Sequence, residues 1–208
     1  QGLLMKDPGI RWCNSSVLNG KVIILTTLIA LLISCHSQST QEEIFGIKVS
    51  DLRGGYRSLS ELREHRATVL IFLSPECPLS ENYTLQVREY SENFRKDGIV
   101  FYNIFPGEFY SREEIAAFCD EFLPDNTTLL DPNYLLTRHV GATITPEAFL
   151  LNPGGSVLYS GAIDNWAITL GQKRRKATKS FLRNAILSYL DGKPIETASA
   201  RAVGCFIE

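Results

Sequence analysis

The sequence contains no pair of cysteines in the CxxC arrangement, and no cluster of cysteine and histidine has the spacing of zinc ligands. Such clusters supply the four ligands of structural zinc sites, so we expect neither a zinc site nor any other metal or cofactor. The five cysteines are Cys13, Cys35, Cys77, Cys119 and Cys205. Because their number is odd, at least one thiol lies outside any disulfide within the chain.

A strong excess of charge is also missing. The 21 Lys and Arg residues against 23 Asp and Glu give a formal net charge of -2. The one basic run, Lys173 to Lys176, is short and is expected to be a solvated loop or helix start. We therefore expect no nucleic-acid partner. With 208 residues, 44% apolar and 21% charged, the chain is long enough for one globular domain with or without extensions.

No apolar run is long enough to span a bilayer comfortably, which takes about 20 residues. The run "VIILTTLIALLI", from Val22 to Ile33, follows Lys21 and is typical of a secretory signal. "LISC" closes it, before the polar "HSQSTQEE". This resembles a bacterial lipobox, which implies that Cys35 is the lipid-attached residue; an uncleaved membrane anchor is the alternative.

We accordingly assign residues 1–40 to a leader and the start of a linker, and residues 41–208 to the folded domain with a C-terminal tail. Twenty residues before the apolar run are many for a signal, so translation is expected to begin near Met5 or Val17. Cys13 then has no structural role. Both interpretations of the leader predict a membrane-tethered protein in the bacterial cell envelope, facing the periplasm.

The body alternates between two hydrophobic patterns, which predicts an α/β fold with a mixed sheet. Apolar runs predict strands at residues 44–49, 67–73, 99–105 and 127–131. Helical spacing predicts helices at residues 58–62, 78–97, 132–141 and 181–190, and another that begins at Ser111 with Glu114 in a capping box. The turn "NPGG" between two apolar runs predicts an antiparallel hairpin at the end of the sheet.

Cys77, in "IFLSPECPLSENY", lies where a buried strand runs into a helix. A helix N-terminus offers free N–H groups and about half a positive charge, and both stabilise the reactive thiolate. Pro78 suits the first helical position, and the Ser80 hydroxyl is expected within reach of the Cys77 sulfur. The neighbouring Glu76 carboxylate has the opposite effect, because its negative charge disfavours the thiolate. The alternative is an inert cysteine that packs as a small apolar residue.

The stretches "VLIFLSPECPLS" and "LLDPNYLLTRHVGATITPEAFLLNPGGSVLYSGAID" together resemble the thioredoxin-like superfamily, in particular its redoxin (AhpC/TSA-like) branch of membrane-tethered thiol oxidoreductases and antioxidant peroxiredoxin relatives. The resemblance covers residues 44–190. It implies a mixed central sheet with flanking helices, a cis-proline at Pro146, and a substrate groove formed by Thr145 and Pro146.

The second active-site cysteine of that family is replaced by Ser80, which leaves a Cys-Pro-Leu-Ser site. A single cysteine can attack a disulfide or a peroxide, but another group must release it from the mixed intermediate. The best candidate is Cys205, in the tail "AVGCFIE". The alternative is that Cys205 packs as an apolar residue. Cys119 is expected to be structural.

We therefore expect an extracytoplasmic thiol-disulfide oxidoreductase with Cys77 as nucleophile, acting on a thiol or disulfide protein and using an external thiol reductant. A thiol peroxidase is the alternative, because Ser74 stands where peroxiredoxins carry Thr or Ser. Leu70 replaces their proline, and their arginine partner is not identifiable. A copper chaperone would need a CxxxC, and Glu81 occupies the place of its second cysteine.

Overall fold

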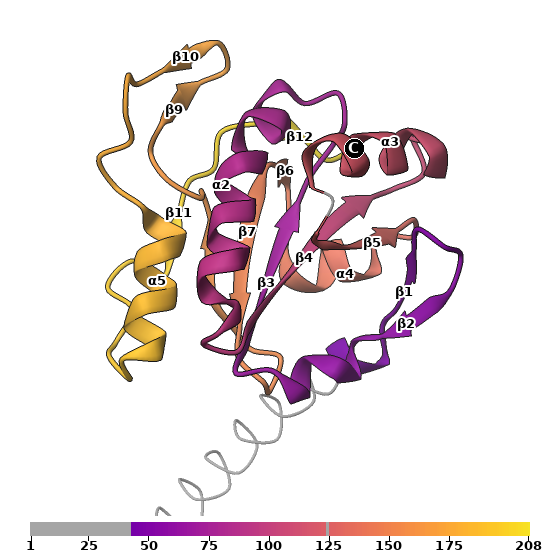
Figure 1. Cartoon of the computed structure of the whole chain (residues 1–208), viewed down its shortest axis with the longest axis horizontal. Coiled ribbons are helices and arrows are strands. Elements are labelled where there is room, and N and C mark those ends of the chain that lie inside the picture. The colour runs from indigo at the N-terminus through magenta and orange to yellow at the C-terminus, as the bar shows by residue number, and fades with distance from the viewer. Residues whose placement is uncertain (1–42, 124) are drawn as a thin grey trace, which may run out of the picture. The chain divides into compact units, whose positions relative to one another are not determined.

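The computed structural model describes residues 43–123 and 125–208. Its main feature is an eight-stranded mixed sheet in the order β11-β8-β7-β3-β4-β5-β1-β2 (Figure 1). Its strands are β1 (Lys48–Asp51), β2 (Tyr56–Ser58), β3 (Ala67–Phe72), β4 (Ile99–Pro106), β5 (Thr127–Asp131), β7 (Glu147–Leu151), β8 (Val157–Gly161) and β11 (Ser199–Ala200). Two short pairs lie outside it: β9 (Ala167–Thr169) with β10 (Gln172–Lys173), and β6 (Ile144–Thr145) with β12 (Cys205–Phe206).

The centre of the sheet confirms the predicted mixture of strand directions. β3 is buried along its whole length and runs parallel to β4 but antiparallel to β7. β4 and β5 are parallel, and β7 and β8 form the expected antiparallel hairpin. The parallel strands β3 and β4 therefore end at the same edge of the sheet, and a loop leads from the end of β3 into helix α2.

Helices cover both faces of the sheet. Buried side chains of α2 (Pro78–Arg95), α3 (Arg112–Phe122) and α5 (Phe181–Leu190) pack on one face. The 3-10 helix η1 (Leu59–Glu64), α4 (Leu135–Val140) and the helical residues 43–46 contribute to the core on the other face. Alternate residues of β3 serve the two cores: Val69 and Ile71 face the first, Leu70 and Phe72 the second.

Helix α2 positions the predicted nucleophile, and its sequence explains its limits. Pro78 occupies its first turn, where no amide donor is needed. Tyr83, Val87 and Phe94 recur along one buried face. Gly98, with φ of 78°, lets the chain turn after the helix and enter β4. The predicted capping box of α3 is also confirmed, since Ser111 and Glu114 exchange both bonds.

The strand predicted over residues 44–49 is wrong. Residues 43–46 are helical, and the strand begins only at Lys48. The physical reason is pairing: β1 forms a hairpin with β2 across the Gly54-Gly55 turn, and this register places the strand later. A short apolar run such as "IFGI" does not distinguish helix from strand by itself. Among the described residues, no helix has both the length and the hydropathy needed to cross a bilayer.

Candidate active site

Cys77 is the residue that immediately precedes helix α2, at the end of the loop that leaves β3. The loop folds back on itself: the Cys77 N–H donates to the Ser74 carbonyl (3.2 Å). The Ser74 N–H in turn donates to the Ser80 Oγ (3.1 Å). The first-turn serine of the helix therefore ties the loop that carries Cys77 to the start of α2.

The surroundings of Cys77 lower the pKa of its thiol. Burial, the largest single influence, acts to raise this pKa. Hydrogen bonds from the Cys205 thiol and from the backbone of Ser80, Cys205 and Leu79 together outweigh burial and favour the thiolate. The side chain is only 1% exposed, so these hydrogen bonds act on a buried thiol.

The short strand β6 runs beside Cys77 from the opposite direction. The Cys77 thiol donates to the Thr145 carbonyl (3.0 Å), and the Thr145-Pro146 peptide bond is cis, as the resemblance implies. The Glu147 Oε2 accepts from the N–H groups of Thr143 (2.9 Å) and Ile144 (3.4 Å). The Glu147 carboxylate thereby fixes the backbone at the start of β6. Burial raises the pKa of this carboxyl group, and the two hydrogen bonds oppose the rise.

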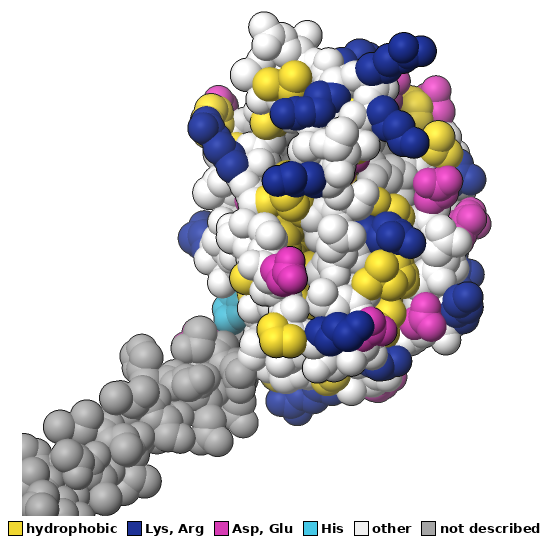
Figure 2. All heavy atoms as spheres, turned by 90° about the vertical axis from the view of Figure 1, so that its left-hand side faces the viewer, with side chains coloured by type: hydrophobic (Ala, Val, Ile, Leu, Met, Phe, Trp, Pro, Cys, Tyr) yellow, Lys and Arg dark blue, Asp and Glu magenta, His cyan; other side chains and the backbone are white. Residues whose placement is uncertain are grey.

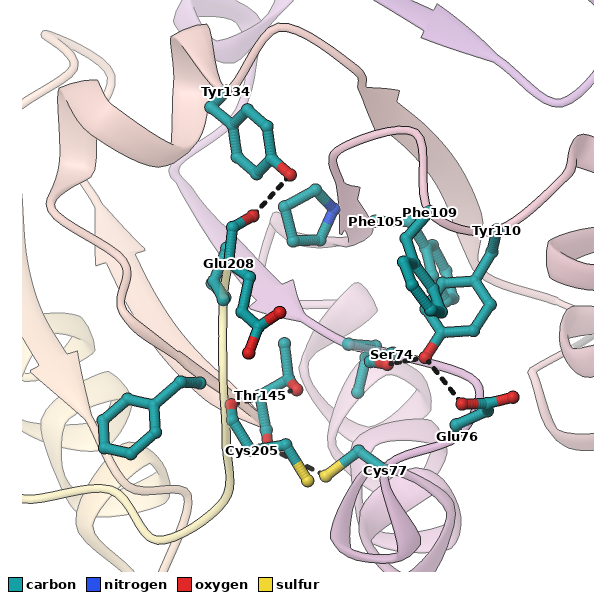
Figure 3. Close-up of a pocket in the computed structure, with 14 residues that line it drawn as sticks. Ser74, Glu76, Cys77, Phe105, Phe109, Tyr110, Tyr134, Thr145, Cys205 and Glu208 are labelled. Atoms are coloured by element: carbon teal, nitrogen blue, oxygen red, sulfur yellow. Dashed lines mark hydrogen bonds between the residues drawn. The ribbon is translucent and has the colours of Figure 1, made fainter.

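The C-terminal tail returns to this edge and places Cys205 beside Cys77 (Figure 3). β11 first pairs in parallel with β8. β12 then pairs antiparallel with β6, where Cys205 is opposite Thr145 and Phe206 is opposite Ile144. In this state all three described cysteines are free thiols.

Two glycines allow the tail to lie this close. Gly161 has φ of 119°, and a Cβ on it would collide with the Ala200 carbonyl. A Cβ on Gly204, directly before Cys205, would collide with the Thr145 carbonyl. The tail thus packs closely against the sheet at two places, where β11 pairs with β8 and where β12 pairs with β6. Cys205 lies in the second of these strands.

The two thiols are electrostatically unequal. Burial and then the hydrogen bond and negative charge of Cys77 raise the pKa of Cys205 to about 11. Cys205 is accordingly the proton-bearing partner and Cys77 the one that favours thiolate. Once Cys77 enters a disulfide it carries no charge, and this part of the rise in the Cys205 pKa disappears.

A pocket of about 330 Å³ opens over the two sulfurs (Figure 3). Aromatic side chains shape much of its wall, and Phe109 (80% exposed) and Phe206 (78% exposed) stand at its rim. Its ionisable carboxylates are Glu76 and Glu208, and within the described chain no Lys or Arg lines it. An apolar, acidic pocket favours uncharged or cationic substrate groups over anionic ones.

The loop side of the pocket carries a hydroxyl cluster. The Ser74 Oγ donates to the Tyr110 hydroxyl (3.1 Å), which donates to the Glu76 Oε2 (3.4 Å). Glu76 is therefore directed toward Tyr110 and away from the sulfurs (Figure 3). The sequence pattern did not single out Tyr110, Phe109 or Phe206; the available signal was that an aromatic residue, Phe206, directly follows the tail cysteine.

The structure therefore brings Cys77, Thr145 and Cys205 into one pocket. Ser80 lies next to them, but its hydroxyl accepts from the Ser74 N–H, and its backbone is what faces Cys77. Cys119 lies apart from them in the core, with its sulfur 3.2 Å from the Thr128 Oγ1. Cys35 and Cys13 lie outside the described residues. No group of His, Cys, Asp and Glu side chains suited to a metal occurs in the described part of the chain.

Comparison with known proteins identifies the fold. No protein-family model matches the chain, and a search of curated proteins found no match. Among solved structures, a hypothetical protein from Sinorhizobium meliloti has a TM-score of 0.68 at 22% identity, covering 77% of this chain and 89% of its own.

Two further structures carry descriptive names. A thioredoxin-like protein from Aeropyrum pernix has a TM-score of 0.53 at 16% identity, covering 64% of this chain and 90% of its own. A secreted disulfide oxidoreductase of Mycobacterium tuberculosis has a TM-score of 0.51 at 12% identity, covering 73% and 98%. These likenesses show that the chain has the thioredoxin-like α/β fold, with a mixed central sheet and flanking helices.

Proposed function

We propose that the chain is a thiol-disulfide oxidoreductase whose redox centre is the pair Cys77 and Cys205. One observation carries this proposal: the tail pairs with β6 and delivers the Cys205 thiol to the hydrogen-bonding environment of Cys77. The secreted disulfide oxidoreductase with the same fold adds support from outside the chain. Helix α2 supplies the remaining requirement, a cysteine at its N-terminus with a lowered pKa.

In the first step, the Cys77 thiolate attacks one sulfur of a client disulfide. The client S–S bond breaks, its second sulfur leaves as a thiolate and takes a proton, and Cys77 is left in a mixed disulfide with the client. The apolar pocket over the sulfurs would receive the client segment, and the Thr145 carbonyl, which accepts from the Cys77 thiol, would guide it.

In the second step, Cys205 loses its proton and attacks the Cys77 sulfur of the mixed disulfide. The bond between Cys77 and the client breaks, the second client thiol is released, and a Cys77–Cys205 disulfide forms. The client has gained two electrons and the protein has lost two; an external dithiol would restore the reduced pair by the same exchange in reverse. The raised pKa of Cys205 keeps it from competing with Cys77 in the first step.

We propose that this exchange takes place outside the cytoplasm, with the chain attached to a membrane through Cys35. The signal-like run at residues 22–33 and the lipobox-like "LISC" support the placement. The likeness to a secreted oxidoreductase is consistent with it. The same proposal includes a boundary close to residue 40, between the leader and the folded domain.

The peroxidase alternative has less support. Peroxide reduction needs a donor that stabilises the departing oxygen, and no arginine lines the pocket in the described part of the chain. Ser74, the residue that suggested this chemistry, donates its hydroxyl to Tyr110. A disulfide substrate has no such requirement, because its leaving group is a thiolate.

Thiol mapping by mass spectrometry tests the proposal. The reduced full chain is mixed with a protein disulfide or with hydrogen peroxide, quenched by alkylation, and digested. We expect the disulfide substrate to give a Cys77–Cys205 disulfide together with two released client thiols, at a rate well above that with peroxide. Faster formation with peroxide would favour the peroxidase, and failure to form this disulfide with either oxidant would contradict the redox pair.

A further inference from the structure

A second hollow lies beside the thiol pocket, between the β9–β10 hairpin and the C-terminal segment 199–206. It is a groove of about 720 Å³, walled on one side by residues 167–170 and on the other by residues 199–204. Phe206 lines both the groove and the thiol pocket, so the groove leads to Cys205. In Figure 1 the hairpin stands above β11, and the yellow C-terminal segment runs from β11 toward β12.

The groove has an uncompensated positive charge. Arg174, Lys179 and Arg201 line it, and within the described residues none of them takes part in an ion pair. Asp164, the one acidic residue in its described lining, is buried and already accepts from the Tyr83 hydroxyl (2.7 Å) and the Trp166 N–H (2.8 Å). In a chain with a net charge of -2, this groove favours a negatively charged occupant.

The same groove exposes apolar side chains and is lined by backbone that has no hydrogen-bond partner among the described residues. Ile168 is 44% exposed and Leu170 61% exposed, both at the hairpin. In Figure 2, which faces this side, Lys and Arg side chains lie around apolar ones over the upper part of the surface. The backbone of residues 201–203 makes no hydrogen bond to any other described residue. Such a stretch can accept another chain as an added strand.

Hydrogen bonds made by Asn165 and Asp164, the residues just before β9, hold the β9–β10 hairpin in place. The Asn165 side chain donates to the Thr178 Oγ1 (2.9 Å) and accepts from the N–H groups of Thr178 (2.8 Å) and Lys179 (3.0 Å). The Tyr83 hydroxyl ties Asp164, at the hairpin base, to helix α2. A groove that exists before binding loses little conformational entropy when it is filled.

We propose that this groove binds an extended segment of a client protein in which acidic and apolar residues alternate. Its backbone would pair with residues 201–203, its acidic side chains with Lys179 and Arg201, and its apolar side chains with the hairpin. A client cysteine just beyond Phe206 would then face the thiol pair. The docking is a property of the groove alone; only the use made of that cysteine rests on the proposed oxidoreductase.

Peptide binding to the full chain is the direct test. The probe is a fluorescent, cysteine-free peptide of about ten residues that alternates Glu and Val. Two matched peptides have Lys in place of Glu, or alternate backbone nitrogens methylated. Fluorescence anisotropy at low ionic strength should show that the acidic peptide binds, that the Lys peptide does not, and that N-methylation weakens binding because it removes strand pairing.

Two double variants with the same change in charge locate the site. Lys179→Gln with Arg201→Gln removes two groove cations and should weaken the acidic peptide about tenfold. Arg175→Gln with Lys176→Gln removes two exposed cations that are close to Arg174 and Lys179 in the sequence but do not line the groove. This variant should leave the affinity for the acidic peptide within about twofold. Equal losses in both variants, or no binding of the acidic peptide at millimolar concentration, would overturn the proposal.

A second readout separates this proposal from the proposed function. Exchange with a small neutral dipyridyl disulfide needs the thiols but not the groove, so the Lys179→Gln, Arg201→Gln variant should retain its rate. If that exchange is absent in the native chain while the acidic peptide binds, the oxidoreductase fails and the groove stands. Binding of anionic vesicles or single-stranded RNA through Lys179 and Arg201 with greater affinity than the peptide would contradict a protein client.

Discussion

Cys77 and Cys119 are almost equally hidden from solvent, at 1% and 4% exposure, but their thiol pKa values are shifted in opposite directions. Cys77 precedes the first turn of a helix, where N–H groups and a second thiol favour the thiolate. Cys119 lies in the second half of α3, inside the hydrophobic core. Burial therefore does not by itself decide the direction in which a thiol pKa is shifted; the place of the cysteine along the helix and its hydrogen-bond donors do.

Cys119 shows what burial does when such donors are few. Burial raises the pKa of its thiol, a hydrogen bond with Thr128 opposes this, and the charge of Asp120 raises the pKa further. The thiol is held in its neutral form and packs with the aromatic core of α3. The structure is thus consistent with the structural role expected for Cys119.

The largest difference between the two cysteines should appear in the exchange rate with a protein disulfide. Cys77→Ser removes the proposed nucleophile, so we expect a loss of about a thousandfold, to the uncatalysed rate. Cys119→Ser should leave the rate within about twofold and cost about 1 kcal/mol in the free energy of unfolding. Stopped-flow exchange and urea unfolding measure the two effects. Equal losses of activity would mean that the comparison is wrong.

A smaller effect is expected where the tail meets β6. Gly204→Ala places a methyl group against the Thr145 carbonyl and should displace Cys205, slowing closure of the Cys77–Cys205 disulfide about tenfold. Gly46→Ala is the matched control, because nothing lies within 4 Å of a Cβ at that position. Quenched-flow alkylation followed by mass spectrometry gives both rates. If the Gly204 variant closes as fast as the Gly46 variant, the tail does not position Cys205.

The smallest expected effect is on pH dependence. Because the Cys77 pKa is lowered, its reaction rate with a neutral disulfide should reach half its maximum at a lower pH than the rate of a free cysteine does. Cys205→Ala removes a hydrogen bond that stabilises the thiolate, so the midpoint should move to higher pH. The lowered pKa also stabilises the fold above the unfolded-state pKa, and this contribution is lost as the pH falls through the folded-state value. An unchanged midpoint in the Cys205→Ala variant would show that the two thiols do not interact.

The central strands and the long helices could be predicted because their signals are local. The run "ATVLIF" is buried on both faces, and the stripe of Tyr83, Val87 and Phe94 has helical spacing. Only a short loop separates the end of β3 at Phe72 from the start of α2 at Pro78, so the position of Cys77 directly before the helix was predictable as well. The strand predicted at residues 44–49 failed because pairing with β2 decides where β1 begins.

The tail was harder, because its conformation depends on partners far away in the sequence. "VGCFIE" suggests a strand only weakly, and nothing in it specifies pairing with Ile144 and Thr145. The role of Gly204 became visible only once the Thr145 carbonyl was placed against it. The partner of the Ser80 hydroxyl was missed for a similar reason. We expected this hydroxyl near the Cys77 sulfur, but the fold of the loop places it where it accepts from the Ser74 N–H.

The most direct test of the redox pair is whether removing Cys205 traps the client on Cys77. The Cys205→Ser and Cys119→Ser variants, each reduced, are mixed with a protein disulfide, quenched with acid, and examined by non-reducing electrophoresis and peptide mapping. We predict that a mixed disulfide at Cys77 accumulates in the Cys205→Ser variant, whereas the Cys119→Ser variant releases reduced client and forms the Cys77–Cys205 disulfide. Equal release of reduced client by both variants would contradict the account, because Cys77 would then be freed without Cys205.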